Sequence, residues 1–498
     1  MSPTTLFTAR VGQTNGEKGG AGLNAKPPTA RKEKLMDKRI NEYLQSKKDE
    51  FISDLRRLVE INSVRTNEKE GMPFGEGGAE ALKEAAAILC EHSYTPTNFD
   101  NYALEADFGN APEMMLLAHL DVVPEGDGWT KDPYKLTLEG DIAYGRGTTD
   151  DKGAAVACLY ALDALRAIYG NPKTGVRLVL GSGEETGSED MDHYFSKRPA
   201  LKYTLSPDAD YPLINIEKGR FAPFFKRTVK NEGSVKLISF DGGDTQNIVP
   251  SKASALVEGI SAAEVKSIAE KISVETKAEF ILEETASGVL IKANGVSAHA
   301  ASPEKGNNAQ TALIRLLAAM PLEGETKQAL CSLDEVFPHG ETNGENANLK
   351  LCDSVSGSLT LNFGVMSFNG SEFLCGTDLR CPILADSMDI KGIFAEKLSE
   401  CGFTYVGSPE FRKAHYVSED SELVKTCLRV YEEFTGNKGE CLAIGGGTYV
   451  HDIDGGIAFG IEFPGRDYRI HGADEYADIN ELLLTAEMYA AVIKELCY

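Results

Sequence analysis

Five short segments of histidines and acidic residues recur along the chain, and the last lies far from the other four. They are His119-Leu-Asp121, Asp150-Asp151-Lys152-Gly153, Glu184-Glu185, Asp208 and His471. A site for two divalent cations needs imidazole or carboxylate ligands for each ion, a carboxylate between the ions, and a free carboxylate to activate a shared water. The five segments can supply all of these groups. The fold would therefore have to bring distant parts of the chain together.

The first three of these segments follow apolar runs that read as strands. One run, Met114 to Ala118, leads into His119, and another, Leu178 to Gly181, precedes Glu184. Ligand sites in open α/β sheets usually lie at the ends of strands. The surrounding pattern predicts an α/β alternation, with helices near 78–92, 152–168 and 189–196 and strands near 102–108, 113–118, 175–181 and 201–206.

The middle of the chain has a different character. Residues 217–410 read as short strands and helices without a metal-type cluster, and a helix near 420–436, a strand near 456–463 and a helix near 479–496 then restore the earlier alternation. Two independent tandem domains would leave His471 far from the other candidate ligands. We therefore expect a catalytic domain formed by 36–216 and 411–498, interrupted by an inserted lid domain at 217–410.

The first 35 residues differ from the rest. They are rich in Gly, Pro, Thr, Lys and Asn and lack apolar periodicity, which predicts a disordered leader over 1–35. Met36 is an alternative start of translation. From Ile40 to Val59 the apolar residues fall on one helical face, which predicts one amphipathic helix of roughly six turns.

Composition excludes several classes of partner. The net charge of −25 and the pI near 4.8 argue against binding to nucleic acid or to an anionic membrane. No stretch approaches the roughly 18 apolar residues that span a bilayer. The ten cysteines form no C-x-x-C pair and, without an apolar signal sequence, favour a reducing cytoplasm over a disulfide framework.

Each segment also has an ordinary structural interpretation. His119 could be a strand-end histidine capped by Asp121, and Asp150 could cap a helix. Glu184 and Glu185 could lie in a solvated turn, although adjacent carboxylates after an apolar strand are costly unless cations lie nearby. A turn is equally possible for Asp208, as is a simple loop for His471. The complete set favours a metal site more strongly than any single member does.

The set resembles a known family. The segments H-L-D-V-V-P, G-R-G-T-x-D-D-K-G, G-x-E-E and S-P-D-A and a late histidine occur in the order found in the cocatalytic di-zinc family of aminoacylase, glutamate carboxypeptidase and succinyl-diaminopimelate desuccinylase. The likeness is greatest to the bacterial dipeptidase V branch, the carnosinase-like dipeptidases, and covers about residues 40 to 498. It implies an α/β, zinc-exopeptidase-like catalytic domain with an inserted α+β lid domain.

The resemblance also implies roles for individual residues. His119 and Asp208 would hold one metal, Glu185 and His471 the other, with Asp150 between them, Asp121 orienting His119, and Glu184 as the general base. A cis peptide would join Asp150 to Asp151.

Further roles are implied for the lid and for a glycine-rich loop. His299, in Gly295-Val296-Ser297-Ala298-His299, would reach the scissile carbonyl, and Asn247 and Arg380 would bind substrate. The loop Gly445-Gly446-Gly447-Thr448 lacks the Lys and the spacing of a phosphate loop. By the resemblance, the substrate-binding residues of this loop would be Gly446, Gly447 and Thr448, which would hold the substrate carboxylate through backbone N–H groups.

These expectations define an enzyme. We expect a monomeric metallopeptidase that hydrolyses dipeptides with a free N-terminus, with Glu184 accepting a proton from a water between two divalent metal ions. Zinc is the expected metal, and manganese or cobalt are alternatives because oxygen-rich sites accept them. An N-acyl-amino-acid deacylase or desuccinylase of the same family would use the same centre. A binding module that kept the fold without activity would be expected to lack a ligand or the base, and none is missing.

Overall fold

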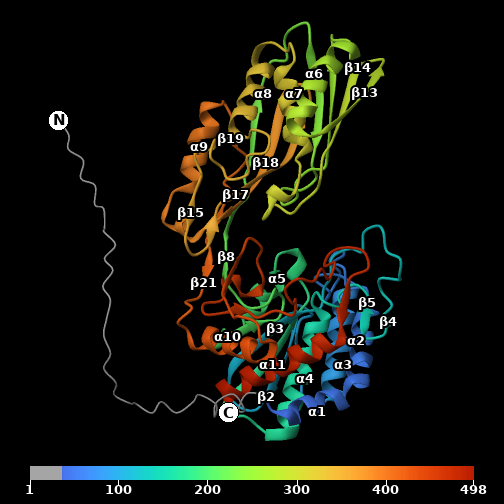
Figure 1. The fold of residues 1–498 in the computed structure, drawn as a ribbon, viewed down its shortest axis with the longest axis vertical. Helices are drawn as coiled ribbons and strands as arrows, with labels where there is room; N and C mark the ends of the chain where they lie inside the picture. Colours follow the sequence, from blue (N-terminus) through green and yellow to red (C-terminus); the bar gives the residue numbers. More distant parts are fainter. Residues whose placement is uncertain (1–35) are drawn as a thin grey trace, which may run out of the picture.

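The computed structural model describes residues 36–498, so the leader predicted over 1–35 lies outside the described residues. The described chain forms two bodies (Figure 1). One contains the early part of the chain and the C-terminus, and the other, drawn above it in yellow-green to orange, contains the middle of the chain. The structure thus has an α/β catalytic body and a mixed lid, as the sequence predicts.

A nine-stranded sheet forms the centre of the catalytic body. The strand order is β1-β2-β6-β3-β7-β23-β8-β21, and β22 pairs with β8. The strands are β1 (Thr97–Phe99), β2 (Ala103–Phe108), β3 (Pro112–His119), β6 (Gly175–Gly181), β7 (Tyr203–Ser206), β8 (Ile214–Glu217), β21 (His415–Tyr416), β22 (Leu442–Ile444) and β23 (Ile457–Ala458). A separate three-stranded sheet has the order β24-β5-β4, with β4 (Thr137–Glu139), β5 (Ile142–Tyr144) and β24 (Tyr476–Asp478).

The central strands explain where the site lies. β3 runs parallel to both β6 and β7, so their carboxyl ends meet at one edge of the sheet. All seven residues of β6 are buried, because helices cover both faces of a parallel sheet. The acidic segments that follow these strands are therefore delivered to the same edge.

Helices pack around this sheet. They are α1 (Lys38–Ser46), α2 (Lys48–Val59), α3 (Glu76–Glu91), α4 (Lys152–Tyr169), α5 (Glu189–Phe195), α10 (Glu422–Thr435) and α11 (Ile479–Cys497). α4 packs against α11, α1 and α2 as well as against the sheet. Its alanine-rich sequence allows this close packing, and its residues from Lys152 to Leu165 are all buried.

The lid is built on a ten-stranded sheet. Its order is β13-β14-β12-β11-β17-β18-β10-β19, and β9 joins β18 to β20. The strands are β9 (Gly219–Phe221), β10 (Phe224–Thr228), β11 (Lys236–Gly242), β12 (Lys252–Glu258), β13 (Glu279–Thr285), β14 (Gly288–Asn294), β17 (Thr360–Phe368), β18 (Glu372–Cys381), β19 (Thr404–Tyr405) and β20 (Phe411–Arg412); β15 (Cys352–Asp353) and β16 (Gly357–Ser358) form a separate pair.

One face of the lid sheet is covered and the other is more open. Burial alternates along β14, which is the pattern of a strand with one face on a core. The lid helices are α6 (Ala262–Thr276), α7 (Ala309–Ala319), α8 (Gly324–Val336) and α9 (Ile390–Glu400). They pack with the sheet around a second apolar core, separate from that of the catalytic body.

The chain crosses between the two bodies twice. It leaves the first sheet after β8 and enters the lid sheet at β9, then leaves the lid after β20 and returns at β21. The division at 217 and 410 stays a proposal, and its second bound lies just before β20, which pairs within the lid sheet. No helix of residues 36–498 has the length and apolar character that crossing a membrane requires.

Two local predictions differ from the structure. The helix predicted from Ile40 to Val59 is two helices, α1 and α2, because the chain turns at Lys47, whose backbone is not helical. The strand predicted near 456–463 is short, and only Ile457 and Ala458 pair in the sheet. In both places the apolar pattern is set by burial, which does not require continuous regular structure.

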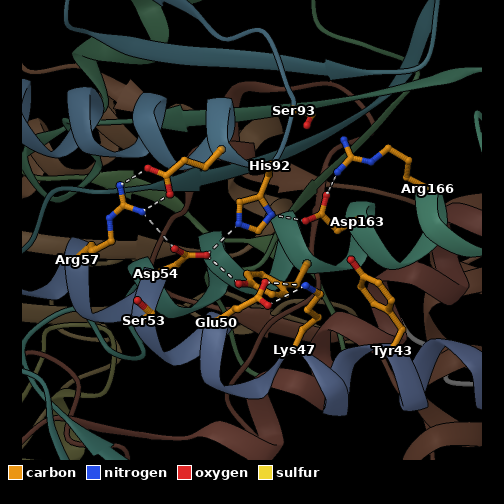
Figure 2. Close-up of a pocket in the computed structure, with 12 residues that line it drawn as sticks. Tyr43, Lys47, Glu50, Ser53, Asp54, Arg57, His92, Ser93, Asp163 and Arg166 are labelled. Carbon is orange, nitrogen blue, oxygen red and sulfur yellow. Dashed lines mark hydrogen bonds and ion pairs between the residues drawn. The ribbon is translucent and has the colours of Figure 1, made fainter.

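A polar cluster lies between α2 and α4 at the end of α3 (Figure 2). The ring of His92 lies between Asp54, at 3.0 Å from Nε2, and Asp163, which contacts Nδ1. Arg57 pairs with Asp54, and Arg166 pairs with Asp163 at 2.6 Å. Burial lowers the pKa of His92, but the two carboxylates outweigh it and raise this pKa to about 9. The ion pairs of this cluster link α2, the end of α3 and α4.

Candidate metal centre

His119 ends β3 and is fully buried. Its Nδ1 lies 3.0 Å from the backbone oxygen of Asp121 and 3.4 Å from a carboxylate oxygen of the same residue. Its Nε2 lies 3.0 Å from Asp150 and 3.8 Å from Asp208. A proton on Nδ1 would be held by Asp121, which leaves Nε2 as the nitrogen that faces the acidic cluster.

Asp150 lies between two histidines. One of its carboxylate oxygens is 3.0 Å from Nε2 of His119 and the other is 2.8 Å from Nε2 of His471. The residue lies two positions before the start of α4, and the peptide joining it to the N-cap residue Asp151 is cis, as the resemblance implies. Segments far apart in sequence thus converge on one carboxylate.

Glu184 and Glu185 begin a single 3₁₀ turn, Glu184–Thr186, after β6. The two carboxylate oxygens of Asp121 accept the backbone N–H groups of Glu184 at 3.2 Å and of Glu185 at 3.0 Å. Asp121 therefore connects the histidine of one strand end to the acidic turn of the next. The Glu185 carboxylate lies 3.2 Å from Nε2 of His471.

His471 reaches the cluster from a loop with unusual backbone geometry. Its φ is +59°, and Arg469 and Asp474 have φ values of +57° and +56°. Non-glycine residues rarely adopt this left-handed conformation, and such residues tend to cluster at functional sites. The loop turns the imidazole toward Asp150 and Glu185.

The donor set fits divalent cations. His119, Asp150 and Glu185 place ligand atoms within 4.8 Å of one another, as do His119, Glu184 and Asp208. Imidazole nitrogens together with carboxylate oxygens suit zinc and related ions.

Charge crowding in the cluster leads to the same conclusion. Burial, and next the charge of Asp208, raise the pKa of Glu184 well above its usual range. Burial and Asp150 raise the pKa of Asp208 to about 7. Burial lowers the pKa of His471, but its hydrogen bond to Asp150 contributes to a net rise to about 11. These groups attract protons as they would attract cations, because several anions share one buried space.

Glu475 supports the centre and was missed by the sequence analysis. It is fully buried, and one of its oxygens accepts the backbone N–H groups of Gly147, Thr149 and Asp150 at 3.0, 3.0 and 3.2 Å. The other accepts a hydrogen bond from Arg146 at 2.6 Å. Glu475 thereby fixes the loop that carries Asp150. Its position four residues after His471 is the only signal that the sequence offers.

Lid residues face the same cleft. The backbone N–H of Ala300 donates to the oxygen of Asn247 at 2.8 Å, which holds the His299 segment beside Asn247. Burial, with the charge of Arg380, lowers the pKa of His299, which favours the neutral form of its ring. Arg380 donates to Asp378 and to the backbone oxygen of Gly445, both at 2.5 Å.

The glycine-rich loop is only partly free to bind a ligand. The N–H and the hydroxyl of Thr448 both donate to Glu217, at 3.1 and 2.8 Å. Glu217 also lies 2.9 Å from His451. Thr448 therefore anchors the loop to Glu217. Gly446, Gly447 and Thr448 all line the cleft.

A cleft of about 450 Å³ joins these parts. All the predicted site residues line it except His119 and Asp121, which are buried beneath its floor. The lining members of the predicted site are Asp150, Glu184, Glu185, Asp208, Asn247, His299, Arg380, Gly446, Gly447, Thr448 and His471.

Comparison with known sequences decides the family. The sequence model of peptidase family M20/M25/M40 matches residues 115–495. The chain belongs to this family. As a member of the M20 family it is a metal-dependent hydrolase of peptide bonds.

The M20 protein has similar relatives over nearly its whole length. It is 34% identical over 459 residues to the putative dipeptidase YtjP of Bacillus subtilis, which covers 90% of this chain and 98% of the relative. It is 32% identical over 479 residues to the Beta-Ala-Xaa dipeptidase of Lactobacillus delbrueckii subsp. lactis, covering 93% of this chain and 99% of the relative.

Solved structures show the same fold. Human carnosine dipeptidase 1 aligns with a TM-score of 0.55 and 15% identity over 94% of this chain and 99% of that one. At this level of identity the comparison shows only that the two chains share the M20 fold, with its catalytic and lid parts.

Proposed function

We propose that the protein is a metal-dependent dipeptidase that hydrolyses dipeptides with a free N-terminus. The observation that carries the proposal is the Asp150 carboxylate, which lies 3.0 Å from His119 and 2.8 Å from His471, with Glu185 and Asp208 beside it. A carboxylate placed between two imidazoles is suited to being shared by two cations. The names of the relatives, a putative dipeptidase and a Beta-Ala-Xaa dipeptidase, support the substrate class.

We propose a place for each ion. His119 and Asp208 would hold one, Glu185 and His471 the other, and Asp150 both. When bound, two such cations acidify a water and polarise the scissile carbonyl. We propose zinc, with manganese or cobalt as alternatives, since carboxylates supply most of the ligands.

Glu184 is the proposed general base. Its raised pKa, caused first by burial, suits a group that accepts a proton from the attacking water and later donates it to the leaving amine. Asp121 holds the backbone N–H of Glu184 at 3.2 Å and thereby positions this carboxylate. Removal of the base would leave the metal ligands in place.

The lid residues have complementary roles. The neutral His299 ring would donate a hydrogen bond to the oxyanion that develops from the scissile carbonyl, with Asn247 beside it. Arg380 would bind the α-carboxylate of the substrate, together with the N–H groups of Gly446 and Gly447. His299 lines the cleft within the same chain as the metal ligands, which supports a monomer as the active unit.

The cysteines support the predicted reducing compartment. All ten are free in the structure, and several are buried deep in the two cores. Free cysteines in this number are typical of proteins of the reducing cytoplasm, where we propose that the enzyme acts on small peptides.

The test is a comparison of two substrate classes on metal-reconstituted protein. Free dipeptides and matched N-acetyl amino acids would be assayed at equal concentration. We expect cleavage of the free dipeptides alone. Cleavage of the acylated compounds alone would replace the proposal with a deacylase, and cleavage of neither would indicate a catalytically silent binding protein.

A further inference from the structure

Three arginines stand in a row across neighbouring strands of the lid. In β9 Arg220 is directly opposite Arg380 of β18 on one side and Arg412 of β20 on the other. Side chains directly opposite in antiparallel pairs project from the same face of the sheet. All three line the cleft that contains the candidate metal ligands.

The row has spare hydrogen-bonding capacity. Asp378 accepts hydrogen bonds from Arg380 and, at 2.9 Å, from Nε of Arg220. Arg412 pairs with Asp452 through one terminal nitrogen. The Arg220 and Arg412 side chains are 44% and 48% exposed, so their remaining N–H groups face the solvent of the cleft.

This arrangement is costly without an anion. Like charges directly opposite on adjacent strands destabilise a sheet. Asp378 offsets one of the three charges, and Asp452 is 75% exposed, so its pairing with Arg412 is screened by solvent. Lys218 lines the same cleft and adds a further positive charge. Four cationic side chains thus line one cleft in a chain of net charge −25.

We propose that Arg220 and Arg412 bind a second carboxylate of the substrate, the side chain of an acidic C-terminal residue. This inference rests on the proposed dipeptidase function, in which Arg380 takes the α-carboxylate. The guanidinium fork matches a carboxylate in geometry, and the hydrogen bonds are charge-assisted.

The position of the row places the acidic residue at the C-terminal end of the substrate. Arg220 lies directly opposite Arg380, which takes the α-carboxylate, so a second carboxylate that reaches the row belongs to the same residue. A dipeptide of the form Xaa-Glu or Xaa-Asp therefore presents both carboxylates to the lid.

The experiment compares kcat/KM for Ala-Glu, Ala-Gln and Glu-Ala on the metal-reconstituted enzyme. Ala-Gln is nearly isosteric with Ala-Glu and lacks only the charge. We expect Ala-Glu to exceed Ala-Gln by about ten- to hundredfold, the range for hydrogen bonds to a charged group. Equal values for the two would overturn the inference while leaving the dipeptidase proposal intact, and faster hydrolysis of Glu-Ala than of Ala-Glu would overturn the assignment to the C-terminal residue.

Variants test the arginines themselves. Arg412→Gln is expected to lower the ratio of Ala-Glu to Ala-Gln at least about fivefold, because it removes one charged partner. Asp452→Asn removes the carboxylate that competes for Arg412 and is expected to raise the ratio. Arg429→Gln is the matched control, since Arg429 is an exposed arginine that pairs with Glu495 on the helices of the catalytic body. A ratio that is unchanged in Arg412→Gln would contradict the proposal, and hydrolysis of no dipeptide at all would remove the dipeptidase function and this inference with it.

Discussion

Replacing Glu475 with glutamine tests how the loop that carries Asp150 is held. Glu475 accepts three backbone N–H groups through one oxygen and Arg146 through the other, and both side chains are almost wholly buried. A glutamine amide has one accepting oxygen and one donating nitrogen. Whichever way the amide is oriented, donors would face donors, and the Arg146 charge would lose its partner.

The expected cost is large because the pair is buried. Removing one partner of a buried ion pair costs about 3–5 kcal/mol, since the remaining charge is uncompensated. Mutation of a residue that orients a metal ligand typically weakens metal affinity by about 10–100-fold. For Glu475→Gln we therefore expect a loss of about 3–5 kcal/mol in the free energy of unfolding and zinc binding weakened by at least about tenfold.

Two assays measure these effects. Urea unfolding of the metal-free proteins gives the stability difference, and competition with a chelator gives the zinc affinity. Glu487→Gln is the control, because Glu487 is a buried carboxylate on α11 that contacts Asn41 and not the loop. A stability loss below about 1 kcal/mol in Glu475→Gln, the net contribution of one ordinary hydrogen bond, together with unchanged zinc affinity, would show that Glu475 does not hold the loop.

Three further predictions concern the base, the polar cluster and the metal. Glu184→Gln should lower kcat by at least about a hundredfold, the usual contribution of general base catalysis, while metal content measured by elemental analysis stays at the wild-type value. His92 binds its proton more tightly in the folded state, since its pKa is raised to about 9. The stability from this cluster is therefore complete below pH of about 6.5 and is lost as pH rises through about 9. That loss should be about 1–2 kcal/mol after solvent screening, and His92→Gln should flatten the profile of unfolding free energy between pH 6 and 10. Zinc added to metal-free protein should raise the thermal midpoint through ligand linkage, and Asp150→Asn should reduce that rise; an equal rise in the variant would contradict the shared role of Asp150.

The sequence predicted the parts of the site that follow strands. Apolar runs before His119 and Glu184 identified β3 and β6, and parallel strands deliver their following residues to one edge of the sheet. His471 could be included because a late histidine follows the other segments in the order found in the family, and it lies 2.8 Å from Asp150 in the structure. These inferences rest on local pattern combined with the chemistry that the site requires.

Other features depend on tertiary contacts that no local pattern encodes. Glu475 acts through backbone N–H groups of a loop far away in the chain, so its place four residues after His471 does not reveal which groups it holds. The row of arginines depends on the register of β9 and β20, strands too short to show periodicity. Thr448 was predicted to bind substrate, but its N–H donates to Glu217, which only the fold reveals. We therefore propose Gly446 and Gly447 as the carboxylate-binding part of that loop.

The central claim is that one cluster, shared by two cations, hydrolyses dipeptides. The most direct test is a titration of metal-free enzyme with zinc, in which hydrolysis of Ala-Gln is followed as a function of bound metal. We predict no turnover without metal and a maximum at two ions per chain. Turnover that persists in the metal-free enzyme, or that reaches its maximum with one ion per chain, would contradict it.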